Sequence, residues 1–279
     1  RADTRRNGLL PSLATFFLVV YIYTAVVYPA LHAFIPLPFL PAGQRLMPLM
    51  VVLSMACHGV YCLGWRNLLT LLVLTVGISW ALEHVGVATG LIYGRYYYTD
   101  AMGAKLGHVP IVIPLSWFRI IYPSYLMANV LTGSELVGTT GPLRRVLLLS
   151  SLTAAIMTSW DLVLEPMGTA LQVPPWVWLD GGLYFGTPLH NLAGWFVTGA
   201  VICMAYRLFE RRSPPTPMGP FGAGTPWVPL LAYGSTMVAD AMAADRLAVY
   251  LVAPVAMGVP LLLTIARVRA GYMRGGSPN

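Results

Sequence analysis

The chain alternates between long apolar runs and shorter polar stretches that are rich in glycine and proline. Windows of about twenty residues, the length that crosses a bilayer as a helix, give eight such runs. They lie near residues 8–28, 46–64, 68–85, 110–131, 145–165, 189–208, 227–243 and 247–266. The pattern therefore predicts an all-α fold, a polytopic membrane helix bundle with about eight transmembrane helices.

Composition points to the same class. Hydrophobic residues make up 57% of the 279 residues and charged residues only 10%, and the mean hydropathy is +0.69. Globular proteins are about a quarter charged, so this chain has too few charges to cover a water-facing surface. We predict one integral-membrane domain over residues 1–279 in the inner (plasma) membrane. It comprises a motif-bearing core at 68–208, a cytoplasmic linker at 209–226 and two last helices within 227–266.

The basic residues indicate an orientation. Sixteen arginines and one lysine give a net charge of +7. If the N-terminus is cytoplasmic, twelve of them, Arg207 included, lie on the cytoplasmic side, four lie outside, and Arg119 lies within a span. This excess follows the positive-inside rule and predicts that both termini are cytoplasmic. The arginines occur singly or in pairs between apolar runs, so we expect no nucleic-acid partner.

Missing motifs exclude several chemistries. The three cysteines have no metal-type spacing, and the five histidines do not form the clustered boxes of a membrane di-iron enzyme. No paired Asp-rich motif suggests Mg-diphosphate chemistry, and no lysine lies in a span to form a retinal Schiff base. We therefore expect no metal and no cofactor, and a reaction that proton transfer alone can drive.

Three acids lie at the outer ends of two apolar runs, where ionisable groups are costly and commonly functional. Asp161 and Glu165 are four residues apart and share a helix face, and Pro166 is expected to end the helix at Glu165. Helix C-termini and a low dielectric both disfavour ionised acids, so we expect at least one to hold a proton, as a general acid must. Asp161 lies deepest and is the preferred acid, with Glu83 or Glu165 activating water. The exchanged roles stay open.

Other polar groups accompany the acids. Arg119 lies roughly 14 Å into its helix, at 1.5 Å per residue, and we expect Asp161 or Glu83 to be its counter-charge. His190 and Asn191 open the next helix beside the acids and are candidates for binding water.

Aromatic residues concentrate at the outer boundary. Most of them are interpreted as an interfacial belt. A subset near the acids is a candidate for holding a polyene or stabilising a carbocation through ring faces. This subset is Trp80, Trp160, Tyr96 and Tyr184.

The two long outer loops, 86–109 and 166–188, follow similar motifs. Ser79-Trp80 precedes Glu83 as Ser159-Trp160 precedes the acids of the second helix, at an offset of eighty residues. Spans 3–4 and 5–6 are therefore predicted to form an internal repeat around one pseudo-symmetric cavity.

Two blocks of these residues resemble the membrane carotenoid hydratases. The first comprises 83–90 (EHVGVATG), 93–99 (YGRYYYT) and 109–110; the second comprises 160–161, 165–166, 176–178 (WVW), 182, 184–189 (YFGTPL) and 191–195. The resemblance covers about residues 75–200. It implies a lipid-soluble carotenoid substrate, membrane lipid as surroundings, and other carotenoid-pathway enzymes as partners. It also implies hydration of the terminal 1,2 double bond of an acyclic ψ end group, by protonation at C2 and water capture of a tertiary cation at C1.

Two alternatives remain open. A membrane lycopene-type cyclase begins with the same protonation but excludes water, so that a neighbouring double bond captures the cation. A transporter or carotenoid-binding membrane protein would use the acids to carry protons or for structure alone. The polar group of His190, Asn191 and Arg119 favours hydration, because it offers sites for water.

Overall fold

The computed structural model describes residues 2–133, 135–222 and 224–275. Each predicted apolar run forms a helix. The first half contains α1 (Ala2–Ile22), which continues through a wide turn at Tyr23–Val27 into α2 (Tyr28–Leu31), then α3 (Pro41–Leu63), α4 (Trp65–Thr89) and α5 (Val112–Leu131). The second half contains α6 (Leu143–Ala170), α7 (Leu189–Arg212), α8 (Trp227–Ala244) and α9 (Leu247–Ala253), which continues through Pro254–Gly258 into α10 (Val259–Gly275).

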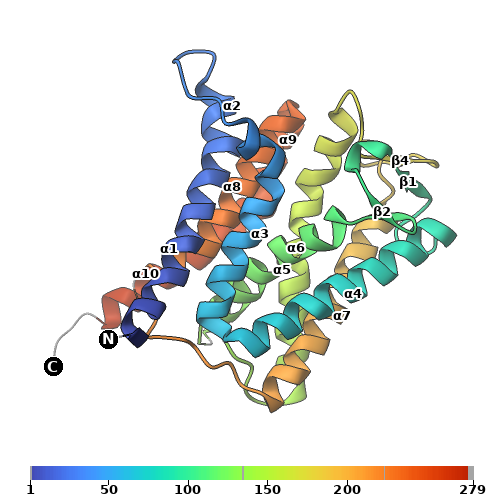
Figure 1. Cartoon of the computed structure of the whole chain (residues 1–279). Coiled ribbons are helices and arrows are strands. Elements are labelled where there is room, and N and C mark those ends of the chain that lie inside the picture. Colours follow the sequence, from blue (N-terminus) through green and yellow to red (C-terminus); the bar gives the residue numbers. More distant parts are fainter. Residues whose placement is uncertain (1, 134, 223, 276–279) are drawn as a thin grey trace.

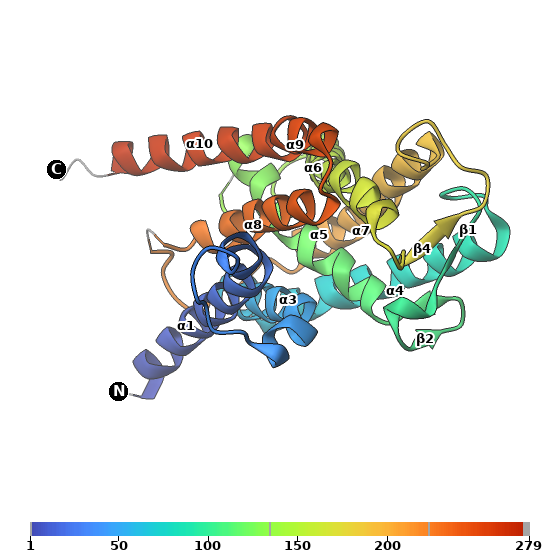
Figure 2. The same cartoon turned by 90° about the horizontal axis from the view of Figure 1, so that it is seen from above.

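The helices confirm the class of a polytopic membrane bundle. Among the residues that the structure describes, six segments are long and apolar enough to cross a membrane: Gly8–Leu31, Leu46–Leu63, Trp65–Thr89, Leu143–Ala170, Leu189–Arg212 and Leu247–Gly271. The other two predicted spans correspond to α5 and α8, which carry polar residues such as Arg119 and Asp240. The α5 helix lies centrally in Figure 2 and contacts α3, α4, α6, α8 and α10. The count of eight spans stays a prediction.

Two sequence-based boundaries were wrong. The α6 helix does not end at Glu165 but continues through Pro166 to Ala170. The predicted linker at 209–226 begins inside α7, and its remainder lies along the end of α3, where the amide of Thr216 donates to the carbonyl of Leu63 (3.1 Å). This segment is held by backbone hydrogen bonds.

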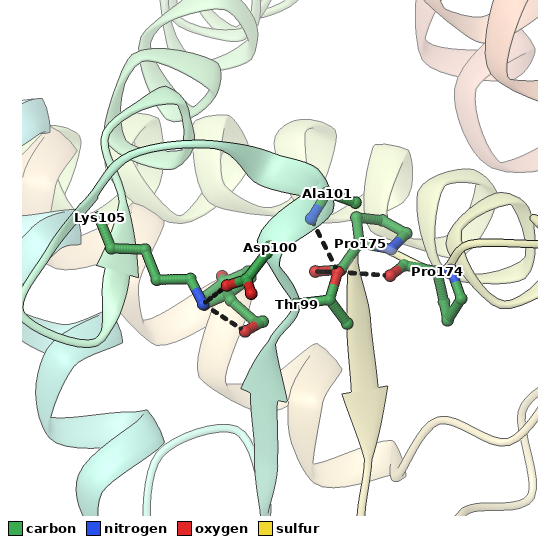
Figure 3. Close-up of polar contacts among 7 residues, drawn as sticks. Thr99, Asp100, Ala101, Lys105, Pro174 and Pro175 are labelled. Carbon is green, nitrogen blue, oxygen red and sulfur yellow. Dashed lines mark hydrogen bonds and ion pairs between the residues drawn. The ribbon is translucent and has the colours of Figure 1, made fainter.

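The two long loops, 86–109 and 166–188, are joined by short strands. Strand β1 (Tyr96–Tyr98) pairs antiparallel with β4 (Trp176–Trp178), with Tyr96 opposite Trp178 and Tyr98 opposite Trp176. A second pair joins β2 (Lys105–Leu106) to β3 (Val109–Pro110) within the first loop. Figure 3 shows the hydroxyl of Thr99 donating to the carbonyl of Pro174 (2.7 Å), which extends the contact between the loops. The pairing brings two distant segments together over one part of the bundle.

The start of α1 and the end of α10 lie at the same end of the molecule, away from the strand-bearing loops (Figure 1). Which end faces the cytoplasm stays a prediction from the basic residues. Arg207 was counted among the twelve basic residues on the cytoplasmic side, but its side chain is fully buried. Its guanidinium donates to Asn129 (2.9 Å), Thr139 (2.9 Å) and Thr153 (3.2 Å), so it stabilises the bundle interior rather than facing the aqueous phase.

Candidate active site

A cavity of about 570 Å³ lies under the paired strands. Its walls come from α3, α4, α5, α6, α7 and α8 and from both outer loops, and they are mainly apolar and aromatic. The predicted site residues that line it are Glu83, Glu165, Arg119, Asn191, Trp160 and Tyr96. An apolar chamber with a few convergent polar groups is typical of a small-molecule site.

Glu83 is buried near the C-terminal end of α4 and is held by three donors. Its Oε2 accepts hydrogen bonds from the hydroxyls of Tyr96 and Tyr98, the latter at 2.9 Å. Its Oε1 accepts, from the part of the chain that the structure describes, only the indole N–H of Trp117, at 3.3 Å. One oxygen is therefore firmly fixed, while the other is weakly engaged at the cavity wall.

Glu165 has an equivalent environment on α6. Its Oε2 accepts hydrogen bonds from Trp176 (3.0 Å), Trp178 (2.9 Å) and Thr187 (2.9 Å). Its Oε1 accepts only from the amide of Asn191, at 3.4 Å. Two aromatic side chains of β1 thus donate to Glu83, and two of β4 donate to Glu165. The pairing of the strands places these two sets of donors side by side.

Asp161 is completely buried beside Glu165 but is not among the residues that line the cavity. Its Oδ2 accepts a hydrogen bond from Asn191 at 2.7 Å, and its Oδ1 has no hydrogen-bond partner among the described residues. The amide of Asn191 therefore bridges Asp161 to Glu165, and through Glu165 to the cavity.

The expected ion pair of Arg119 with Asp161 or Glu83 does not form; within the described chain no ion pair involves Arg119. Its guanidinium carbon instead lies 4.6 Å from the ring centroid of Trp160, a cation–π contact. The indole nitrogen of Trp160 donates to Oδ2 of Asp240 at 2.6 Å. Asp240 was not among the predicted site residues, because it lies on α8, far along the chain from the motifs.

Besides Asp161, three candidate residues do not line the cavity. Trp80 is half-buried, stacks on His84 and donates its indole N–H to the carbonyl of Leu106 (3.1 Å). His190 is exposed at the start of α7. Tyr184 donates its hydroxyl to the carbonyl of Leu162 at 2.5 Å.

The contact of Tyr184 has a structural cause. Proline has no amide hydrogen, so Pro166 leaves the carbonyl four residues earlier, that of Leu162, without its helical partner. The hydroxyl of Tyr184 supplies the missing donor, which explains how α6 passes through Pro166.

The interpretation of the tryptophans as mostly an interfacial belt was also wrong for several of them. Trp117, Trp176 and Trp195 are buried and line the cavity, and the rings of Trp117 and Trp195 stack at 4.3 Å. Trp117 donates to Glu83 and Trp176 donates to Glu165, so two of the three contact an acid.

Tyr93 completes this wall between two glycines. A Cβ at Gly86 would lie 2.6 Å from its ring, and a Cβ at Gly194 would lie 2.5 Å from it. Its hydroxyl hydrogen-bonds Thr198 at 2.8 Å. Glycine on α4 and on α7 is therefore what lets this ring reach the cavity.

Among the described residues, no group of three or more His, Cys, Asp or Glu side chains is placed to hold a metal ion. The site can hold an apolar molecule against aromatic rings, and it presents carboxyl groups with weakly engaged oxygens at the wall. Such an arrangement suits proton transfer to and from an apolar substrate.

Comparisons with known proteins place the sequence among carotenoid biosynthesis proteins. A bisanhydrobacterioruberin hydratase from Haloarcula japonica is 34% identical over 139 residues, which span 50% of this chain and 44% of that protein. No solved structure matches the chain. A family model described as carotenoid biosynthesis protein matches residues 43–265. The resemblance to carotenoid hydratases is thus confirmed, and because the family match covers most of its length, the chain belongs to the carotenoid biosynthesis protein family.

Proposed function

We propose that this protein adds water across the terminal 1,2 double bond of an acyclic carotenoid end group. The observation that carries the proposal is the convergence of Glu83, Glu165 and the adjoining Asp161 at one aromatic-walled cavity. The hydratase named above, similar over half of the present chain, supports the same reaction type. The substrate is a lipid-soluble polyene whose end group enters the cavity.

The reaction requires a proton at C2, because this places the positive charge at C1, where a tertiary cation forms. Water then forms the C1–O bond and loses a proton to a carboxylate. The net change is alkene plus water to tertiary alcohol, and no redox step occurs. Side chains that donate and accept protons therefore suffice for the chemistry.

The hydrogen bonds suggest how the proton is held. Glu165 accepts from four donors, an environment that suits a carboxylate. Asp161 accepts from one donor, and its Oδ1 has no partner among the described residues. Of the two neighbouring acids, Asp161 is therefore the one whose oxygen can carry a proton. We assign Asp161 as the proton store, the acid that supplies Glu165 with its proton. Because Asp161 does not reach the cavity wall, Glu165 passes the proton to the substrate.

Glu83 faces the same space from α4 and lies close enough to Glu165 for the two carboxyls to interact electrostatically. Its Oε1 has a single long contact, to Trp117, and is available to a water molecule. The stacked rings of Trp117 and Trp195 line the same cavity, and aromatic rings stabilise a nearby cation through their faces.

Cyclisation is the second candidate, since it shares the first protonation. The polar groups that line the cavity favour hydration, because Asn191, Arg119 and Asp240 offer hydrogen-bonding positions for water. A cyclase needs a dry surface around C1.

Product analysis in cells that make lycopene tests the proposal. Expression of the protein should yield a carotenoid with one or two added water molecules and an unchanged number of rings. A cyclised product of unchanged mass would establish the cyclase instead. Unaltered lycopene at normal protein levels would contradict both enzymatic proposals for this substrate.

A further inference from the structure

The cavity has a second polar wall, separate from the three acids. Asp240 on α8 and Arg119 on α5 both line the chamber, and both contact Trp160 of α6. Trp160 and Asp161 are consecutive, so their side chains leave α6 about 100° apart. The Trp160 side chain, which contacts Asp240, therefore leaves α6 in a different direction from Asp161.

This wall has unused hydrogen-bonding capacity. The Nε of Arg119 is buried and has no hydrogen-bond partner within residues 2–133, 135–222 and 224–275. Asp240 accepts the indole N–H of Trp160 through Oδ2, and its Oδ1 has no hydrogen bond in the described part of the chain. A buried donor and a nearby acceptor oxygen without partners are the groups that an ordered water molecule satisfies.

The charges are also suited to a water molecule that loses a proton. Arg119 and Asp240 interact electrostatically, and each contacts Trp160, yet no ion pair joins them in the described structure. A carboxylate held in this way keeps an oxygen free to act as a base. The guanidinium offsets its charge without occupying that oxygen.

We propose that Asp240 is the general base of the hydration reaction, binding with Arg119 the water molecule that captures the cation. This inference rests on the proposed function. The acid cluster delivers a proton to C2, the water oxygen forms the bond to C1, and the proton lost from that oxygen passes to Asp240. Transfer of this proton back to the acid cluster through water restores both groups, so the cycle consumes only alkene and water.

The competing role for Asp240 is structural, as an anchor for Trp160. Substitution Asp240→Asn separates the two roles, because the amide oxygen still accepts the indole N–H but the group no longer takes up a proton. Asp245→Asn is the matched control. It makes the same change of charge five residues later, at an exposed residue whose left-handed conformation asparagine tolerates.

The experiment incubates membranes containing the full-length protein with lycopene in buffered D₂O. Mass spectrometry then measures two quantities, hydroxylated product and deuterium in the recovered lycopene. Deuterium enters the substrate when the acid cluster deuterates C2 and the cation returns to alkene by losing the original C2 hydrogen. Exchange therefore reports protonation, and product reports water capture.

For Asp240→Asn we expect hydroxylated product to fall about tenfold or more, while deuterium in recovered lycopene stays at or above the wild-type level. Asp245→Asn should match the wild type in both. Arg119→Gln should show the same separation as Asp240→Asn, and it tests the proposal independently if Asp240→Asn does not accumulate.

Two results would overturn the assignment. Product within twofold of wild type would remove Asp240 from the reaction. A parallel loss of product and deuterium exchange would make it a structural anchor or part of the acid. Absence of hydroxylated product from the wild-type protein would instead contradict the proposed function, so the two failures are distinguishable.

Discussion

The substitution Asp161→Asn tests the assignment of the acid most directly. The side chain is completely buried, and the present carboxyl accepts one hydrogen bond, from Asn191 at 2.7 Å. The new amide oxygen can take over that bond, so the near-isosteric change keeps the packing of α6. What it removes is the ability to hold and release a proton.

The expected magnitudes follow from this geometry. A positioned general acid contributes about 10²–10⁴ in rate, equivalent to about 2.7–5.4 kcal/mol at 1.36 kcal/mol per tenfold. The new NH₂ would occupy the place of Oδ1, which has no partner, and an unsatisfied buried donor costs about 1–3 kcal/mol of stability. Activity should therefore fall by at least a hundredfold, while the protein loses only part of its stability.

The assay compares hydroxylated carotenoid formed per unit of protein in membranes, together with the unfolding temperature of the purified protein in detergent. Asp245→Asn again serves as the exposed control. If Asp161→Asn turned over within threefold of wild type, Asp161 would not be the acid. If Glu83→Gln were inactive in that case, the two acids would exchange roles.

Three further outcomes are expected. In a background without the three native cysteines, Ala104→Cys in the first outer loop should react with an impermeant thiol reagent in intact cells; reaction only after permeabilisation would reverse the orientation. Gly194→Ala places a Cβ 2.4 Å from the carbonyl oxygen of Ile92, so it should destabilise the protein by about 1–3 kcal/mol. Gly77→Ala is the control: its Cβ would meet no described atom within 4 Å, so the unfolding temperature should stay unchanged or rise. Trp160→Leu should slow turnover about three- to thirtyfold through loss of its ring and N–H contacts, and equal effects of Trp160→Leu and Trp227→Leu in single-turnover assays would contradict this.

Much of the site could be predicted because it depends on local order. Glu83 and Glu165 lie near the ends of long apolar helices, and each is followed by an aromatic loop that returns into the next helix. Burial of an acid at a helix end requires donors, and the loop directly after it is the nearest source. Helix ends and loop composition are readable from one sequence, so the two acids and Tyr96 were found.

The misses have a different physical origin, since they depend on packing between distant helices. Asp240 reaches the cavity only because α8 lies against α6 and α5, and a single apolar run does not say which neighbour it meets. The partner of Arg119 was mistaken for the same reason. Tyr184 was predicted to contact the substrate because it is aromatic and follows the acids in the sequence. Its hydroxyl instead donates to the carbonyl of Leu162, which lacks a helical partner only because α6 continues through Pro166.

The predicted repeat can be examined through its two halves. Glu83 accepts from side chains thirteen and fifteen residues later, and Glu165 from side chains eleven and thirteen residues later, in both cases two alternate residues of one strand. The two strands pair with each other, so each acid has the same arrangement of helix, strand and hydrogen-bond donors.

The tryptophans do not follow this similarity, because Trp80 precedes Glu83 by three residues and Trp160 precedes Glu165 by five. At about 100° per residue the two indoles point about 160° apart relative to their acids. One half therefore keeps its indole outside the cavity, and only the other places one at the cavity wall, in contact with Asp240. The matching acids and the unequal tryptophans together give the chamber two chemically different walls, as a reaction with separate proton donor and acceptor requires.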